Sequence, residues 1–137
     1  MYILFKKKGV IRVKDLAKKL KVKPASVVNF LKKLHSKELI CYEKYEFIIL
    51  TKRGLRLAEE IYKKHETIKE FLLEILRIPE NIAEEDACYI EHGIHDITLD
   101  RMDKFVKFVR NHPDSSRFFR YLDSYYESGN IPVKNKV

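Results

Sequence analysis

The sequence has 137 residues, of which 45% are hydrophobic and 35% charged, and this composition is typical of a folded globular protein and excludes a disordered chain. Two cysteines are too few for a disulfide framework, no apolar run is long enough to span a membrane, and the first residues lack the pattern of a secretory signal. We therefore expect a cytoplasmic protein with reduced thiols and one core or two small subdomains.

The net charge of +8 is distributed unevenly along the sequence. Residues 1–77 hold 20 Lys and Arg against 9 Asp and Glu, whereas residues 78–137 hold 8 against 11. The first part is therefore strongly basic (+11) and the second mildly acidic (−3). A basic segment of this kind favours a polyanionic partner such as nucleic acid, although a solvated lysine-rich surface would give the same counts.

Residues 13–36 carry the pattern of a helix-turn-helix. Apolar side chains recur at helical spacing over residues 13–20, a turn follows at Lys21–Pro24, and a second helix is predicted over residues 24–36. This second helix has a small, polar and basic outer face, which is typical of a DNA-recognition helix. On its inner face we expect it to bury Val27, Phe30, Leu31 and Leu34.

The predicted recognition helix supplies most of the candidate DNA contacts. Asn is able to recognise adenine through two hydrogen bonds, Ser donates to bases or phosphates, and Lys contacts phosphates. The candidates on or beside this helix are Lys23, Ser26, Asn29, Lys32 and Lys33. Lys44 and Arg53 are further candidates for phosphate contacts. A charged, solvated helix face is the alternative interpretation.

A β-hairpin is predicted directly after the second helix. Two β-rich runs, Leu39–Glu43 and Glu46–Leu50, flank a Lys44-Tyr45 tip. A hairpin in this place is the wing of a winged helix-turn-helix. A long helix is then expected from about residue 51 to residue 76, and it would connect the winged domain to a second helical unit.

Three further helices are predicted, so the expected fold is mainly α. They cover residues 80–94, about 99–110, and 115–127. The middle helix is amphipathic and is expected to bury Met102, Phe105, Val106 and Val109. We divide the chain into a winged helix-turn-helix DNA-binding domain over residues 1–62, an all-helical domain over residues 63–129 and a tail over residues 130–137.

Cys88, Glu91 and His92 form a C-x-x-E-H cluster on the helix predicted over residues 80–94. Positions i, i+3 and i+4 share one face of a helix, so a thiolate, a carboxylate and an imidazole would converge there. This mixture of ligands suits a divalent transition metal. In the alternative interpretation, Cys88 is a small core residue, Glu91 is solvated and His92 makes only local hydrogen bonds.

Three further side chains extend this candidate metal site. Glu84 and His95 continue the same polar stripe, and His65 lies in the long helix, where a helical hairpin would bring it opposite Cys88. A thiolate–imidazolium pair of Cys88 and His92 is the enzymatic alternative. We do not expect an enzyme, because no glycine-rich loop or oxyanion-hole motif accompanies that pair in the sequence.

Several of these motifs together resemble the diphtheria toxin repressor family, and especially its shorter branch, the manganese transport regulators. Their order and spacing match over roughly residues 2–110. The motifs are Val13-Lys-Asp-Leu-Ala17, Val22-Lys-Pro-Ala-Ser-Val27, Leu39–Tyr45, Leu50-Thr-Lys-Arg-Gly54, Lys64-His65-Glu66 with Phe71-Leu72, and Cys88-x-x-Glu91-His92. The resemblance implies a homodimer with a helical dimerisation and metal-binding domain. It further implies metal-activated binding to a palindromic operator, usually to repress metal-homeostasis genes, in a short form without the SH3-like domain.

The resemblance also implies a set of metal ligands. His65 corresponds to the family's histidine on the connector helix, and Glu84 falls where some members place an ancillary ligand. The main cluster corresponds to Cys88, Glu91 and His92. A cysteine at the first of these positions is typical of iron-type members, whereas manganese-type members have a glutamate. We therefore favour Fe(II), with Mn(II), Co(II), Ni(II) and Zn(II) as alternatives.

The sequence departs from the family pattern at two places. Lys69 stands where some members have a carboxylate ligand, and Met1 aligns within the family's first helix, close to Gly9, although that helix usually begins earlier and carries a further ligand. Either the start lies upstream, or the metal response is incomplete, altered or absent. The alternative functions are a metal-independent winged-helix regulator and a metal- or redox-sensing interaction protein without DNA binding.

Overall fold

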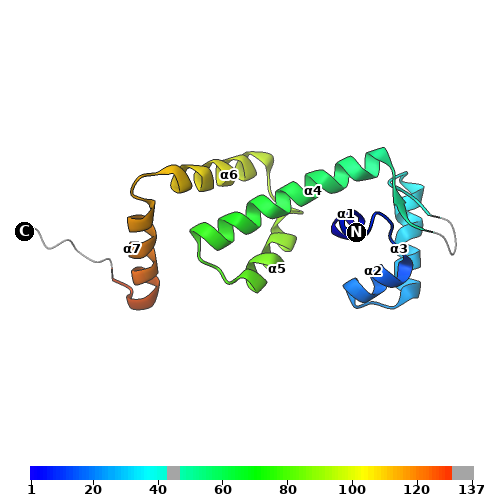
Figure 1. The fold of residues 1–137 in the computed structure, drawn as a ribbon, viewed down its shortest axis with the longest axis horizontal. Helices are drawn as coiled ribbons and strands as arrows, with labels where there is room; N and C mark the ends of the chain where they lie inside the picture. The colour runs from blue at the N-terminus through cyan, green and yellow to red at the C-terminus, as the bar shows by residue number, and fades with distance from the viewer. Residues whose placement is uncertain (43–46, 131–137) are drawn as a thin grey trace, which may run out of the picture. The chain divides into compact units, whose positions relative to one another are not determined.

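The computed structural model describes residues 1–42 and 47–130. Over these residues the chain is mostly helical, with a small two-stranded antiparallel hairpin, and this confirms the predicted fold class (Figure 1). The chain divides into two compact units, Met1–Lys63 and Lys64–Val137, and each is described by itself. Among the described residues, none of the helices is long and apolar enough to cross a membrane.

The first unit contains the predicted helix-turn-helix. Lys21 ends the first helix of the motif in a left-handed conformation (φ 54°), and Pro24 occupies the first turn of the next helix, where its fixed φ is favourable. The elements of this unit are α1 (Tyr2–Lys8), α2 (Val13–Leu20), α3 (Pro24–Ser36), β1 (Ile40–Cys41), β2 (Ile49–Leu50) and the start of α4 (Lys52–Glu70).

The hairpin after α3 is present, but its strands are shorter than predicted. Ile40 pairs with Leu50 and Cys41 with Ile49, and an isolated bridge joins Ile11 to Ile48. The tip predicted at Lys44-Tyr45 lies outside the described residues. Ile40 and Ile48, in the described part of the hairpin, are buried in the same core as the side chains of the helix-turn-helix.

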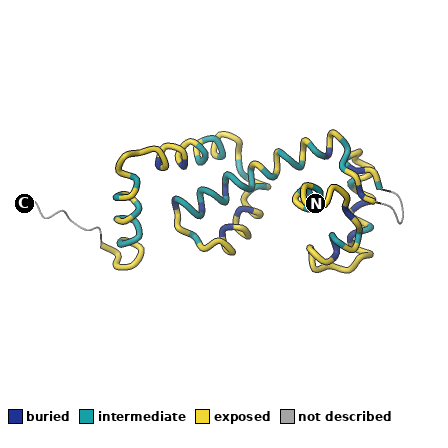
Figure 2. The backbone as a smooth tube through the Cα atoms, in the orientation of Figure 1, coloured by how far each residue is buried: buried dark blue, intermediate teal, exposed yellow. Residues whose placement is uncertain are grey.

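The core of the first unit lies where α2, α3 and the hairpin meet (Figure 2). Its buried side chains are Ile11, Leu16, Ala17, Val27, Leu31, Ile40 and Ile48. The prediction that Phe30 is buried is wrong, since 51% of this residue is exposed. Val27 and Leu31 fill the inward stripe of α3, and Phe30 lies at the edge of that stripe.

The start of α4 is fixed by hydrogen bonds and by a close backbone approach. The Thr51 hydroxyl donates to the Glu38 carbonyl at 2.7 Å and accepts from the Gly54 N–H at 3.0 Å. The Gly54 backbone lies so close to Leu39 that a Cβ atom at position 54 would be 1.8 Å from the Leu39 carbonyl oxygen. Glycine is therefore required where α4 begins.

The second unit continues α4 and adds three helices. A π-helical turn, η1 (Phe71–Ile75), follows α4 directly, with the Leu76 N–H donating to the Phe71 carbonyl at 3.3 Å. The remaining helices are α5 (Glu80–Ile90), α6 (Asp96–Asn111) and α7 (Ser115–Ser128). The predicted long helix thus has the expected extent, but its last turn is wider than an α-helix.

Two small clusters form the core of the second unit, and both include residues from the end of the long helix (Figure 2). The first contains Ile68, Leu72, Ala83 and Ala87, and the second contains Ile75, Val106 and Val109. The prediction that Phe105 faces inward is wrong, because 42% of this residue is exposed. Val106 and Val109 occupy the buried stripe of α6 instead.

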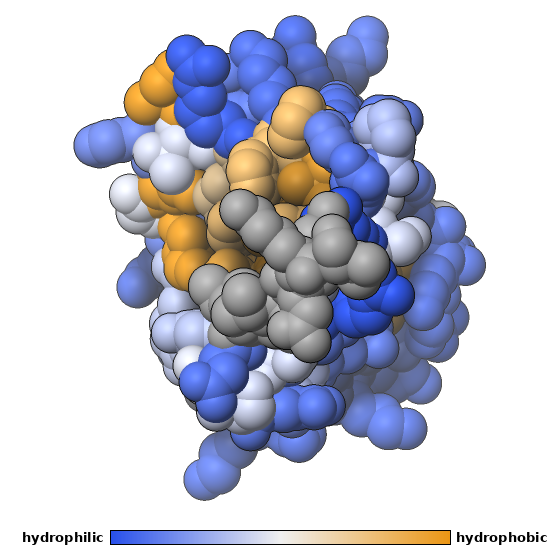
Figure 3. Space-filling view, turned by 90° about the vertical axis from the view of Figure 1, so that its left-hand side faces the viewer, coloured by the Kyte–Doolittle hydropathy of each residue, from blue (hydrophilic) through white to orange (hydrophobic). Residues whose placement is uncertain are grey.

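Helix α7 has no fully buried residue and leaves aromatic side chains exposed. Phe118 of α7 lines an apolar groove with Phe105 and Phe108 of α6. Figure 3 shows apolar side chains gathered on the face of the molecule that carries α7. Arg77 contacts two side chains of α7, with its guanidinium 4.2 Å from the ring centroid of Phe119 and 3.2 Å from a carboxylate oxygen of Asp123.

Candidate metal centre and nucleic-acid surface

The end of α5 brings Cys88, Glu91 and His92 together. The backbone stays helical through Glu91, whose N–H donates to the Ala87 carbonyl at 3.0 Å. One donor atom from each of the three side chains lies within 4.8 Å of the other two. Cys88 and His92 are exposed, whereas only 9% of the Glu91 side chain is exposed. A cysteine sulfur, a shielded carboxylate and an accessible imidazole therefore share one small region.

His65 of α4 joins this cluster through Glu91. Its Nδ1 lies 2.9 Å from Glu91 Oε2, and its Nε2 lies 3.3 Å from Glu84 Oε1. The second oxygen of Glu91 is 3.6 Å from His92 Nε2. Glu91 thus lies between two histidines that come from different elements, and His65 lies between two carboxylates.

Lys69, one turn after His65, contacts the outer side of this network. Its ammonium donates to Glu84 Oε2 at 2.8 Å and to Glu80 Oε1 at 3.4 Å. The hydrogen bond from Lys69 lowers the pKa of Glu84, and the same bond raises the pKa of Lys69. Glu84 is therefore held as a carboxylate between an ammonium and an imidazole.

The prediction that His95 continues the polar stripe of α5 is wrong. Helix α5 ends at Ile90 and not near residue 94, and a turn over residues 91–93 follows it. His95 is instead the N-terminal cap of α6, with an extended backbone, and α6 starts at Asp96 rather than at Leu99. The Asp96 carboxylate accepts a 2.8 Å hydrogen bond from Lys64.

The Cys88–Glu91–His92 cluster fits a divalent transition metal. Sulfur and nitrogen ligands bind such ions at about 2.0–2.3 Å, so two ligands of one ion are at most roughly 4.6 Å apart. Donor atoms within 4.8 Å of one another are close to that spacing before any adjustment. His65 would have to give up one carboxylate contact to add a ring nitrogen, because both of its nitrogens face carboxylates.

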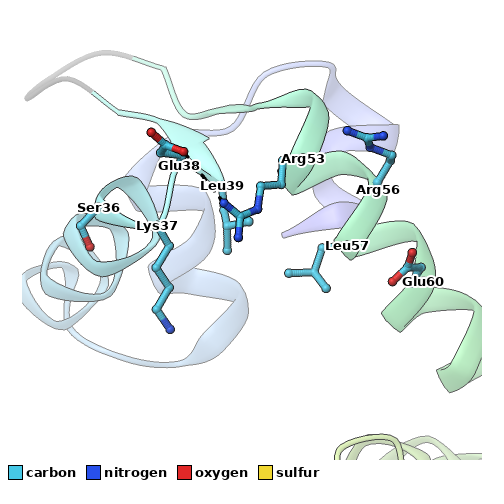
Figure 4. Close-up of a pocket in the computed structure, with 8 residues that line it drawn as sticks. All are labelled: Ser36, Lys37, Glu38, Leu39, Arg53, Arg56, Leu57 and Glu60. Carbon is cyan, nitrogen blue, oxygen red and sulfur yellow. Dashed lines mark ion pairs between the residues drawn. The ribbon is translucent and has the colours of Figure 1, made fainter.

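The candidate DNA contacts on α3 are all accessible. The exposed side chains are Lys23, Ser26, Asn29, Lys32 and Lys33. Arg53 is exposed at the start of α4, where its guanidinium is 3.9 Å from Glu38, as the dashed line in Figure 4 shows. Lys44 lies outside the described residues.

Two cations that the sequence analysis did not select lie beside Arg53. Lys37 and Arg56 line the same surface hollow, with Glu38 and Glu60 as acidic neighbours (Figure 4). Arg53 and Arg56 are three residues apart on a predicted helix, and this spacing could have indicated that both lie on one face.

Two family models match this chain and together cover most of it. The model described as "Iron dependent repressor, N-terminal DNA binding domain" matches residues 1–47. The model described as "Iron dependent repressor, metal binding and dimerisation domain" matches residues 51–120.

Similar proteins and structures agree with these matches. An HTH-type transcriptional regulator of Methanocaldococcus jannaschii is 43% identical over 97 residues, 71% of this chain and 78% of that protein. The regulator MntR of Listeria innocua is 35% identical over 90% of this chain and 86% of that protein.

Two solved structures resemble the chain over its larger part. The manganese regulator SloR has a TM-score of 0.65 at 34% identity over 72% of this chain and 46% of that one. The IdeR of T. acidophilum has a TM-score of 0.66 at 29% identity over 74% of this chain and 47% of that one. The chain thus spans about half the length of these solved chains. From its fold, its site and these matches, the chain belongs to the iron-dependent repressor family, the metal-dependent DNA-binding regulators that its motifs resemble.

Proposed function

We propose that this protein is a metal-dependent DNA-binding transcription regulator, a repressor of genes for metal-ion homeostasis. The observation that carries the proposal is the convergence of Cys88, Glu91 and His92 in a chain that also presents a helix-turn-helix with an accessible polar and basic face. A cluster of metal-type donors joined to a DNA-binding module suits a regulator whose DNA affinity responds to a metal ion.

The two parts of the chain have separate tasks in this proposal. Residues 1–62 bind double-stranded DNA with α3 in the major groove, and residues 63–129 bind metal and dimerise. Two copies then match a palindromic operator in the cytoplasm. The exposed apolar side chains on α6 and α7 support dimerisation, since contiguous apolar surface often marks a protein interface.

The ligands in this proposal are Cys88, Glu91 and His92, with His65 as a further ligand and Glu84 as an ancillary one. A divalent ion would supply the positive charge that draws these donors together. The Cys88 thiolate favours Fe(II) over Mn(II), and Co(II), Ni(II) and Zn(II) are the alternatives. Among the related proteins, SloR is described as a manganese regulator and ScaR as a manganese-activated repressor, and ScaR has also been solved with bound Zn²⁺ and Cd²⁺.

Helix α4 is the element through which metal would influence DNA binding. It begins in the first unit at Lys52 and carries His65 in the second unit, where His65 contacts Glu91. A change in the contacts of His65 therefore acts on a helix that both units share. Metal must bind the DNA-competent state more tightly than the other state, because otherwise it shifts no equilibrium.

The two cysteines provide a matched test of the metal site. Both are free and exposed, but Cys41 belongs to β1 and Cys88 to the cluster. We expect Cys88→Ser to weaken Co(II) affinity at least about 10-fold, since loss of even a supporting residue costs that much, and to remove the thiolate-to-metal absorption band. Cys41→Ser should retain both. Equal Co(II) affinity and equal spectra in the two variants would contradict the proposed site.

A further inference from the structure

Lys69 places a positive charge among side chains that commonly bind metal ions, since its neighbours are Glu80 and Glu84. Its ammonium lies 2.8 Å from Glu84 Oε2 and 3.4 Å from Glu80 Oε1. The other oxygen of Glu84 is 3.3 Å from His65 Nε2. The Lys69 ammonium thus contacts two carboxylates, and one of these carboxylates also contacts an imidazole.

Without Lys69, Glu84 and His65 would offer donors for a second metal ion, and Glu80 lies one helical turn before Glu84 on α5. Carboxylate and imidazole donors bind divalent ions such as Mn(II). One oxygen of Glu84 contacts His65, and the other contacts Lys69, which also contacts Glu80. The Lys69 side chain is only 20% exposed and comes from the same helix as His65, so it is held in place rather than free in solvent. Its ammonium engages the oxygen of Glu84 that faces away from His65.

We propose that the Lys69 ammonium is a built-in cation that takes the place of a second metal ion, so that each protomer binds one ion, at the Cys88–Glu91–His92 cluster. This inference rests on the proposed metal-binding function, specifies its stoichiometry, and removes Glu84 from the set of ligands, because both of its oxygens are engaged by His65 and Lys69. Lys69 acts here as a positioning residue. It holds Glu84 against His65 Nε2, and His65 in turn presents Nδ1 to Glu91.

Counting bound Mn(II) ions in variants of Lys69 tests this proposal. The full chain is dialysed against Mn(II), and metal per protomer is measured for the wild type, Lys69→Gln, Lys69→Arg and Lys63→Gln. Lys63 is an exposed lysine of the same helix, so its variant controls for general loss of charge. We expect one ion in the wild type, in Lys69→Arg and in Lys63→Gln, and a second ion in Lys69→Gln.

The midpoint of thermal unfolding is a second readout, and in chelator it reports the contacts of Lys69 without any bound metal. Lys69→Gln leaves Glu80 and Glu84 without their ammonium, so its midpoint should fall by about 3–6 °C, and Mn(II) should restore it. Lys69→Arg keeps the charge and should retain the midpoint. These measurements also show whether each variant is folded when its ions are counted.

The possible outcomes separate this inference from the proposed function. A second ion in the wild type, or no additional ion in a folded Lys69→Gln variant, would overturn the role given to Lys69. A wild type that binds neither Mn(II) nor, under anaerobic conditions, Fe(II) would contradict the proposed function, and the variant would still decide the role given to Lys69. A gain of one ion in Lys69→Gln would then support it, whereas no gain would overturn it.

Discussion

Glu91 connects the residues on which metal binding would depend. Its carboxylate is almost fully shielded and lies between His65 of α4 and His92 beyond the end of α5. A shielded carboxylate is costly unless it has hydrogen-bonding partners, and the 2.9 Å contact with His65 supplies one. The same carboxylate is therefore ordered before any ion arrives, which reduces the entropy lost when a metal binds.

Side chains on the exposed face of α3 lead to a residue-scale prediction about DNA. Asn29→Ala should relax base preference at one operator position by about 1–3 kcal/mol, because Asn can pair with adenine through two hydrogen bonds. Lys33→Ala should instead weaken binding to all sequences and reduce the salt slope by about one. Fluorescence anisotropy with operator and scrambled duplexes at several salt concentrations measures both effects.

A loss of base preference in Asn29→Ala, together with a uniform loss of affinity in Lys33→Ala, would support α3 as the recognition helix. If Asn29→Ala weakened operator and scrambled DNA equally, Asn29 would not read a base. If neither variant changed DNA binding, the exposed face of α3 would be a solvated surface only.

At the residue scale, the sequence predicted those features that follow from helical spacing. Cys88, Glu91 and His92 were expected to converge because positions i, i+3 and i+4 share a face, and the structure brings them together. The position of His95 could not be predicted in the same way, because it depends on where α5 stops. That boundary is a turn that involves Gly93, and helix ends are set by local capping that periodicity does not encode.

The junction of the hairpin and α4 gives a prediction at the element scale. Gly54→Ala would place a Cβ atom 1.8 Å from the Leu39 carbonyl oxygen, so we expect a loss of at least about 2 kcal/mol in the free energy of unfolding. Gly93→Ala is a matched control, because nothing lies within 4 Å of a Cβ atom there. Chemical denaturation of the two variants measures the difference, and equal stability would show that the backbone at Gly54 has room to move.

The ion pair between η1 and α6 gives a prediction about pH. The Arg110 guanidinium donates to Glu74 through two nitrogens and lowers the pKa of Glu74 below its ordinary value of 4.5. A carboxylate whose pKa is lower in the folded state contributes stability above its unfolded pKa, and that contribution is lost as pH falls through the folded pKa. The pair should therefore stabilise the protein at neutral pH and lose this effect below about pH 4.5.

Glu74→Gln tests this ion pair. Both side chains are more than a third exposed, so solvent screening limits the expected loss at pH 7 to less than about 1 kcal/mol. The difference from the wild type should shrink as pH falls below 4.5. Urea unfolding across pH 3–7 measures it, with the exposed Glu85→Gln as control. A difference that stayed constant with pH would argue that Glu74 stabilises the fold through packing and not through charge.

Elements with a strong apolar period were predicted well, and irregular ones were not. Residues 13–20 and 24–36 repeat apolar side chains at helical spacing, and α2 and α3 have those bounds. The π-helical turn at Phe71–Ile75, which contacts α5 and α6, could not be predicted, because apolar spacing over five residues does not distinguish a π-helical turn from an α-helical one. Exposure of Phe30 and Phe105 was also missed, because periodicity does not show how wide the buried stripe of a helix is.

For the whole molecule, we propose that metal binding by residues toward one end of α4 changes DNA binding by the unit in which α4 begins. The two tasks are encoded in different parts of the sequence, with a basic first part and a helical second part that carries the donor cluster. The family matches follow the same division, with a DNA-binding region over residues 1–47 and a metal-binding and dimerisation region over residues 51–120. Linkage between the two requires a difference in metal affinity between the DNA-competent state and the other state.

The most direct measurement is fluorescence anisotropy with duplex DNA from the protein's own upstream region. It is run anaerobically with Fe(II), with Mn(II) and with chelator, at two salt concentrations, because DNA affinity without a stated salt concentration is not interpretable. We predict tight, sequence-selective binding with metal, stronger for Fe(II), and weak binding in chelator. Equally tight and selective binding in chelator would contradict the account and leave a metal-independent winged-helix regulator.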